Sequence, residues 1–158
     1  MNVLGALAIT LGLALSAPAQ VKTEVPPVEP GAKPATVERI KVHGASLAGY
    51  LEGEGADRAV LVFLPPGYAN RKSRRYPVVY ALHGYSIGAG QRSKEIHVPQ
   101  TTEGAFAKGA KEMIVALPDS KTVYNGSMDS NSVTSGDFEN YIARDVVAYI
   151  DAHRTGNE

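Results

Sequence analysis

The sequence contains no cysteine among its 158 residues. Disulfide bonds, thiol nucleophiles and metal sites with cysteine ligands are therefore excluded. The four histidines show neither an H-E-x-x-H spacing nor a close pairing, so we expect no metal site and no cofactor. A domain without disulfides must be held together by its hydrophobic core alone.

The sequence also lacks an excess of charge, because 16 basic side chains balance 16 acidic ones. No net field favours nucleic acid or an anionic membrane. The one basic cluster, Arg71 to Arg75, lies between two strand-like runs and is interpreted as a solvated loop rather than a nucleic-acid patch. GAFAKGAK (Gly104 to Lys111) misses the phosphate-binding loop pattern by one position, and DSNSVTSGDFE lacks the glycine spacing of a calcium loop.

The N-terminal apolar run, Met1 to Leu15, is shorter than the roughly 20 residues that a membrane-spanning helix needs. It is followed by Ala17-Pro18-Ala19, an A-x-A arrangement that predicts a signal peptide over residues 1–19, cleaved after Ala19, although no basic residue precedes the run. We therefore expect a secreted or periplasmic protein without a stable membrane anchor. Residues 20–35, with four prolines between Val21 and Pro34, predict an extended and poorly packed linker.

Strands are predicted from two kinds of pattern. Alternating apolar and polar residues predict an N-terminal β-hairpin made of Val37 to Gly44 and Leu47 to Gly55. Uninterrupted apolar runs predict three strands buried on both faces, at Arg58 to Tyr68, Tyr76 to Gly84 and Glu112 to Asp119. Buried strands of this kind are typical of a mostly parallel sheet.

Two helices are predicted between and after these strands. Thr101 to Lys111 is expected to be a short crossover helix, and apolar residues spaced by three and four predict a long helix from the N-cap Asp137 to His153. Ile87 to Pro99 contains three helix breakers and no helical periodicity, so no helix is expected there. The order of elements indicates an α/β fold. Because no strand follows the last helix, we expect residues 36–158 to be the N-terminal part of a larger domain, with part of that helix's apolar face uncovered.

The segment HGYSIGAG, His83 to Gly90, allows two interpretations. As a G-x-S-x-G motif it makes Ser86 a nucleophile, with Asp119 and His153 following in the order of a Ser-Asp-His triad. A nucleophile elbow must lead straight into a helix, however, and none is expected here, so this hypothesis is the less favoured one.

As an oxyanion loop, the same segment would aim a backbone N–H at the tetrahedral oxyanion of acyl transfer. The donor would be Tyr85, or Ser86 if the turn is one residue wider. His83 is expected to brace the turn by hydrogen bonding, with direct contact to the substrate as the alternative. Asp119 and Ser120 follow a buried strand at the sheet edge where ligands bind, and are candidates for structural capping or for lining the substrate cleft. The polar loop YNGSMDSNSVTSGDFE after them either lines that cleft or is a surface loop of Asx-turns.

Three blocks of the sequence carry a family resemblance: VFLPPGYANRKSRRYPVVYALHGYS, KEMIVALPDS and YNGSMDSNSVTSGDFENYIARDVVAYIDAH. Together they resemble the esterase D-type "putative esterase" family of α/β-hydrolases over roughly Val37 to His153. That family groups secreted carboxylesterases, feruloyl and acetylxylan esterases, S-formylglutathione hydrolases, enterochelin esterases and mycolyltransferases. The resemblance implies serine-esterase chemistry through an acyl-enzyme, acting on a small-molecule or polysaccharide-linked ester.

In this family the LHG loop contributes an oxyanion N–H. The nucleophile lies in a G-H-S-M-G-type elbow one strand beyond the helix that contains ARDVVAYIDAH, and the acid and base follow later. The resemblance therefore implies an incomplete α/β-hydrolase fold in which nucleophile and triad are missing, and a chain that is inactive by itself. The alternative is a non-catalytic secreted remnant or a binding module for sugars or acyl esters.

Overall fold

The computed structural model describes residues 23–50, 55–71 and 73–154. The predicted signal peptide, residues 1–19, lies outside these residues, as does the start of the predicted linker. No helix in the described ranges is long and apolar enough to cross a membrane.

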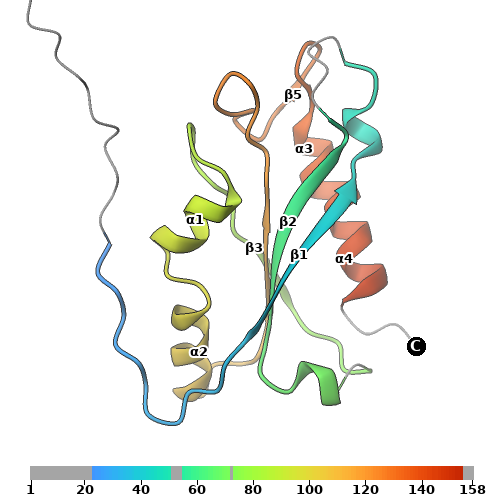
Figure 1. The fold of residues 1–158 in the computed structure, drawn as a ribbon. Coiled ribbons are helices and arrows are strands. Elements are labelled where there is room, and N and C mark those ends of the chain that lie inside the picture. The colour runs from blue at the N-terminus through green and yellow to red at the C-terminus, as the bar shows by residue number, and fades with distance from the viewer. Residues whose placement is uncertain (1–22, 51–54, 72, 155–158) are drawn as a thin grey trace, which may run out of the picture.

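A four-stranded sheet forms the centre of the molecule (Figure 1). Its strands are β1 (Thr36–His43), β2 (Asp57–Leu64), β3 (Val78–Tyr80) and β4 (Ile114–Pro118), in the spatial order β1-β2-β4-β3. β2 runs antiparallel to both of its neighbours, and only β3 and β4 are parallel. The expected mostly parallel order is therefore wrong for the described strands. Among the described residues that connect these four strands, only those between β3 and β4 form α-helices, and such a crossover is what brings two consecutive strands into parallel alignment.

The partner of β1 also differs from the prediction. β1 pairs with β2 rather than with Leu47 to Gly55, of which residues 51–54 lie outside the described ranges. Ala45–Leu47 forms a short 3-10 helix instead, and the Gly44 N–H closes the loop on the Ala56 oxygen at 2.8 Å. Leu47 belongs to this 3-10 helix, and its side chain is buried in the main core. The apolar residue at this position therefore does not indicate a strand with one buried face.

β2 and β4 are buried on both faces, as predicted, because alternate residues of each strand enter different apolar clusters. Val60, Val62, Ile114 and Ala116 belong to one cluster, whereas Phe63, Val115 and Leu117 belong to the other. β3 departs from the prediction, since Val79 is 45% exposed. The strand lies at the edge of the described sheet, where fewer side chains can cover it.

Helices cover both faces of the sheet (Figure 1). α1 (Ala89–Glu95) and α2 (Gln100–Ala107) lie on one face, so the expected crossover helix is present with shifted bounds. α1 contradicts the prediction that no helix follows Ile87. Ala89 is buried against the cluster around Phe63, with Ile96 packed beside it. This tertiary packing outweighs the weak helix propensity of the two local glycines.

On the other face the chain forms one continuous helix: α3 (Phe138–Asn140), a π-helical turn (Tyr141–Val146, labelled η3) and α4 (Val147–His153). Phe138, Tyr141, Val146 and Ile150 are fully buried. The five-residue step from Tyr141 to Val146 suits the wider π turn, which the sequence pattern did not predict. The core cluster covers these four side chains, whereas Ile142 and Tyr149, which belong to the same apolar stripe, are only partly buried.

Asp137 occupies the N-cap position of this helix, as predicted, but its carboxylate makes no capping hydrogen bond. Interaction with this carboxylate raises the pKa of the Tyr50 phenol above its ordinary value.

The described part of the proline-rich segment, residues 23–35, has no helix or strand and buries none of its residues, but it does contact the chain near α2. Glu29 binds Lys108 Nζ at 2.6 Å, the Ala35 N–H donates to Glu103 Oε1 at 2.7 Å, and Gln100 Nε2 donates to the Pro26 oxygen. These bonds tie residues 23–35 to α2 and the residue after it.

Candidate active site

The candidate site lies where the loops after β3 and β4 meet. Because these two strands are parallel and adjacent, their carboxyl ends face the same edge of the sheet, where open α/β sheets bind ligands. The loop after β4 folds back over the loop after β3 and encloses a pocket of about 130 Å³. The pocket is lined by His83, Gly84, Tyr85, Ser120, Gly126, Ser127, Met128 and Asp129. The polar loop predicted either to line a cleft or to form Asx-turns therefore contributes to this lining.

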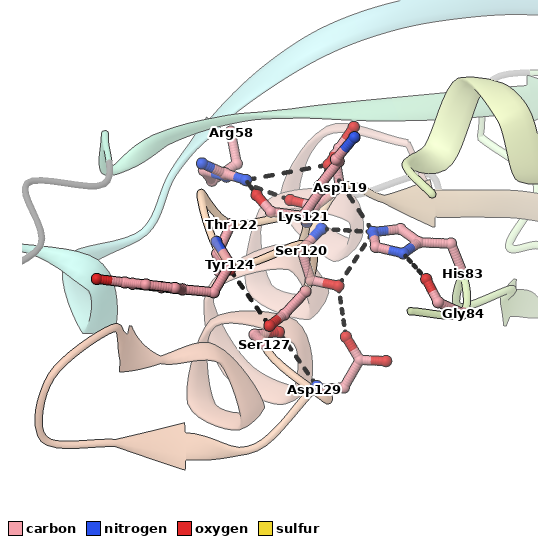
Figure 2. A network of polar contacts seen from close by, with 11 residues as sticks. Arg58, His83, Gly84, Asp119, Ser120, Lys121, Thr122, Tyr124, Ser127 and Asp129 are labelled. Atoms are coloured by element: carbon pink, nitrogen blue, oxygen red, sulfur yellow. Dashed lines mark hydrogen bonds and ion pairs between the residues drawn. The ribbon is translucent and has the colours of Figure 1, made fainter. Parts of the chain in front are cut away.

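The His83 ring lies at the centre of the polar network in this pocket and contacts Gly84, Asp119 and Ser120 (Figure 2). Its side chain is 2% exposed. The Ser120 N–H donates to Nε2 at 2.9 Å, so Nε2 is unprotonated, and Nδ1 must carry the hydrogen that bonds the Gly84 oxygen at 3.0 Å. The predicted bracing of the turn is confirmed by these bonds. Both ring nitrogens are engaged within the protein, which leaves neither for a substrate.

Ser120 lies close to His83 without forming a catalytic pair. Its Oγ is 3.1 Å from His83 Nε2 but donates its hydrogen to Asp129 Oδ1 at 2.5 Å. The lone pair of Nε2 is already taken by the Ser120 N–H. Ser120 is also buried, so this serine supports the structure of the site.

Asp119 caps the end of β4. Its Oδ1 accepts the Lys121 N–H at 3.1 Å and lies 3.9 Å from Arg58 Nη2 and 3.8 Å from His83 Nε2. A Cβ atom built on Gly88 would lie 2.9 Å from the other carboxylate oxygen, so the loop after β3 approaches Asp119 as closely as glycine allows. These contacts correspond to the capping role that the sequence suggested, and Asp119 is not among the residues lining the pocket.

The two candidate oxyanion donors differ in availability. The Ser86 N–H donates to the Asn125 oxygen at 2.8 Å and is therefore used inside the protein. Within the described part of the chain, no acceptor contacts the Tyr85 N–H. The Tyr85 side chain is 59% exposed at the pocket. Of the two amides, Tyr85 alone is open to an oxyanion.

The surroundings of Ser86 partly resemble a nucleophile elbow. Its φ of 69° is left-handed, and α1 begins three residues later, which removes the argument that no helix follows. The proposed base, however, is remote. His153 lines a hollow with Thr36 and Leu64, at the end of the sheet opposite Asp119, and its Nδ1 lies 2.8 Å from the Tyr149 oxygen. The described residues therefore bring no base to Ser86.

The sequence patterns did not identify two residues of the β4 loop, Asn125 and Gly126, as contacts of the loop after β3. The Asn-Gly dipeptide was the available signal, since asparagine tolerates the left-handed conformation that it adopts here, with φ of 74°. What the dipeptide could not indicate is which distant segment this turn contacts.

Solved structures place the fold among the α/β-hydrolases. A ferulic acid esterase matches with a TM-score of 0.64 at 24% identity, over 80% of this chain and 46% of that one. A CE1 ferulic acid esterase from Anaeromyces mucronatus, solved with ferulic acid, matches with a TM-score of 0.61 at 22% identity, over 94% and 52%. An S-formylglutathione hydrolase from Agrobacterium tumefaciens matches with a TM-score of 0.57 at 13% identity, over 78% and 46%. This chain thus spans about half the length of the solved structures that it matches.

These similarities show an α/β-hydrolase-type fold. Within that class, residues 53–158 match the model of the family described as "Putative esterase". The match covers more than half of the chain, and the chain belongs to this family.

Proposed function

We propose that this chain forms the part of an exported serine carboxylesterase that supplies the oxyanion donor, the N–H of Tyr85. The observation that carries the proposal is the open Tyr85 amide beside a pocket at the carboxyl ends of β3 and β4. Membership of the esterase family supports the reaction class. The N-terminal apolar run and its A-x-A site support export.

In the proposed reaction, a serine attacks the ester carbonyl and forms a tetrahedral intermediate, which collapses to an acyl-enzyme that water hydrolyses. The Tyr85 N–H donates to the oxyanion of each intermediate, and one such donor is worth roughly 3 kcal/mol. Because no base reaches Ser86 among the described residues, the proposal assigns nucleophile, base and acid to a further segment that carries the family's G-H-S-M-G-type elbow.

The proposed substrate is a carboxylic ester of a small acid, either free or linked to a polysaccharide. The names of the matching structures, which refer to ferulic acid and S-formylglutathione, support this class. The proposal includes no cofactor, nucleic acid or membrane partner.

Hydrolysis of p-nitrophenyl acetate tests the proposal. The 158-residue chain alone is expected to show no activity above buffer, whereas co-expression with the segment encoded downstream is expected to restore it. Codons for a G-H-S-M-G-type elbow in the DNA after position 153, in any reading frame, would support the same proposal. Activity of the chain alone that Ser86→Ala abolishes would instead make Ser86 the nucleophile of a complete small enzyme.

A non-catalytic binding module is the second candidate, and the covered apolar face of the last helix favours it. Phe138, Tyr141, Val146 and Ile150 are fully buried, which gives this chain a closed core on that face. Cooperative unfolding together with calorimetric binding of an unesterified xylo-oligosaccharide, and no gain of activity with any downstream segment, would favour this candidate over the esterase.

A further inference from the structure

We propose that the loop from Ser120 to Asp129 is a positioning clamp for the oxyanion-hole amide of Tyr85, an inference that rests on the proposed function. The clamp acts on the two peptide units that flank Tyr85. One is held through His83, and the other is held by Asn125.

The first peptide unit joins Gly84 to Tyr85 and carries the Tyr85 N–H. In a planar trans peptide, the C=O and N–H groups point in opposite directions. Because His83 Nδ1–H donates to the Gly84 oxygen at 3.0 Å, the ring sets the direction in which the Tyr85 N–H points. His83 is therefore a positioning residue that acts through the backbone.

The His83 ring is in turn held by the β4 loop (Figure 2). The Ser120 N–H donates to Nε2 at 2.9 Å, and the Ser120 hydroxyl donates to Asp129 Oδ1 at 2.5 Å. Both Ser120 and His83 are buried, so water cannot easily replace these bonds. A continuous series of bonds thus runs from the Asp129 carboxylate to the peptide that carries the oxyanion donor.

The second peptide unit joins Tyr85 to Ser86 and is held from the same loop. The Ser86 N–H donates to the Asn125 oxygen at 2.8 Å. The next residue, Gly126, lies under Tyr85, since a Cβ atom there would be 3.2 Å from the ring atom Cδ2 and 3.7 Å from Cα. With both flanking peptides fixed, the Tyr85 N–H keeps one orientation without any contribution from a substrate, which is the preorganisation that oxyanion stabilisation requires.

Amide hydrogen exchange on the ¹⁵N-labelled full chain tests the clamp. Asn125 has φ of 74°, which valine adopts only with strain and glycine adopts freely. Asn125→Val and Asn125→Gly both remove the amide side chain, so they differ mainly in whether the backbone can keep this conformation. We expect Asn125→Val to speed exchange of the Ser86 amide by about tenfold and to move the Tyr85 amide resonance. Asn125→Gly is expected to leave both close to their values in the unaltered chain.

The Asp129 side of the clamp is tested by the same resonance. Asp129→Ala is expected to move the Tyr85 amide signal, whereas Asp129→Asn, which keeps an oxygen acceptor for Ser120, is expected to preserve it. Ile150→Val serves as the control, because it lowers the stability of the core under the last helix without touching the loop after β4. We expect this variant to leave the Tyr85 amide resonance where it is in the unaltered chain.

An unprotected Ser86 amide in the unaltered chain would overturn the proposal. Equal rates of Ser86 amide exchange in Asn125→Val and Asn125→Gly would also overturn it. So would a Tyr85 amide resonance that does not move in Asp129→Ala. None of these measurements needs ester hydrolysis, so failure of the esterase proposal in the activity assay is seen separately from failure of the clamp.

Discussion

Replacement of His83 by phenylalanine is the most direct test of the polar network, because it keeps a planar ring and removes both nitrogens. The Ser120 N–H would then be buried without an acceptor, which costs about 1–3 kcal/mol, and the Gly84 oxygen would lose a bond worth about 0.5–1.5 kcal/mol. The more apolar ring offsets about 1 kcal/mol of this loss. We therefore expect His83→Phe to lower the free energy of unfolding by about 2 kcal/mol.

Urea denaturation of the purified chain measures this change. A loss of about 2 kcal/mol corresponds to a fall of about 1 M in the unfolding midpoint, given slopes of about 1–3 kcal/mol/M for small domains. His43→Phe is the matched control, since the His43 side chain is 66% exposed and its contact with Asp57 lies at the surface. That variant is expected to stay within about 0.5 kcal/mol of the unaltered chain. Equal midpoints for the two variants would refute the argument that the bonds of the buried ring stabilise the site.

Three further predictions concern the packing around the site and the core. Gly88→Ala, whose Cβ would lie 2.9 Å from Asp119 Oδ2, is expected to destabilise the chain by about 1–2 kcal/mol in urea, whereas Gly90→Ala, with no atom within 4 Å, should be neutral or stabilising. A chain that starts after residue 35 loses the bonds of Pro26, Glu29 and Ala35 to residues 100–108 and should be about 1–2 kcal/mol less stable than one that starts at residue 20; equal stability would show that these bonds do not stabilise the chain. Burial raises the pKa of the Tyr141 phenol above its ordinary 10.0, so the folded state keeps the proton that the unfolded state releases, and stability should fall as the pH rises above about 10. Because this hydroxyl has no hydrogen-bond partner in the described ranges, Tyr141→Phe should not destabilise the chain at pH 7 and should make the alkaline fall in melting temperature smaller.

The elements that sequence patterns predicted correctly are those whose signal is local. β2 and β4 are uninterrupted apolar runs, and each is buried on both faces as such runs indicate. Strand direction was not predictable in this way, because it depends on which distant segment pairs with which. α1 was missed for a related reason, since its local propensity is weak and burial of Ala89 against the sheet stabilises it.

The same division applies to the candidate site. Asp119 and Ser120 are predicted at the ligand-binding edge of the sheet because they follow a buried strand, and the parallel pairing of β3 with β4 brings His83 to the same place. The bonds that join the loop after β3 to the loop after β4, between His83 and Ser120 and between Ser86 and Asn125, span more than thirty positions of sequence, which no local pattern encodes. The Asn125-Gly126 pair predicts a turn, but only the folded chain shows that this turn contacts the loop after β3.

Under the proposed function, the oxyanion donor is oriented entirely by residues of this chain. The Gly84–Tyr85 peptide is held by His83, and the following peptide is held by Asn125, so neither contact requires a nucleophile to be in place. Electrostatic stabilisation of a transition state depends on donors that are fixed before charge develops. A segment carrying the nucleophile would then need only to bring its serine within reach of an ester bound beside Tyr85. The two tasks of the esterase reaction, holding the oxyanion and attacking the carbonyl, would in this way be carried by separate parts of the fold.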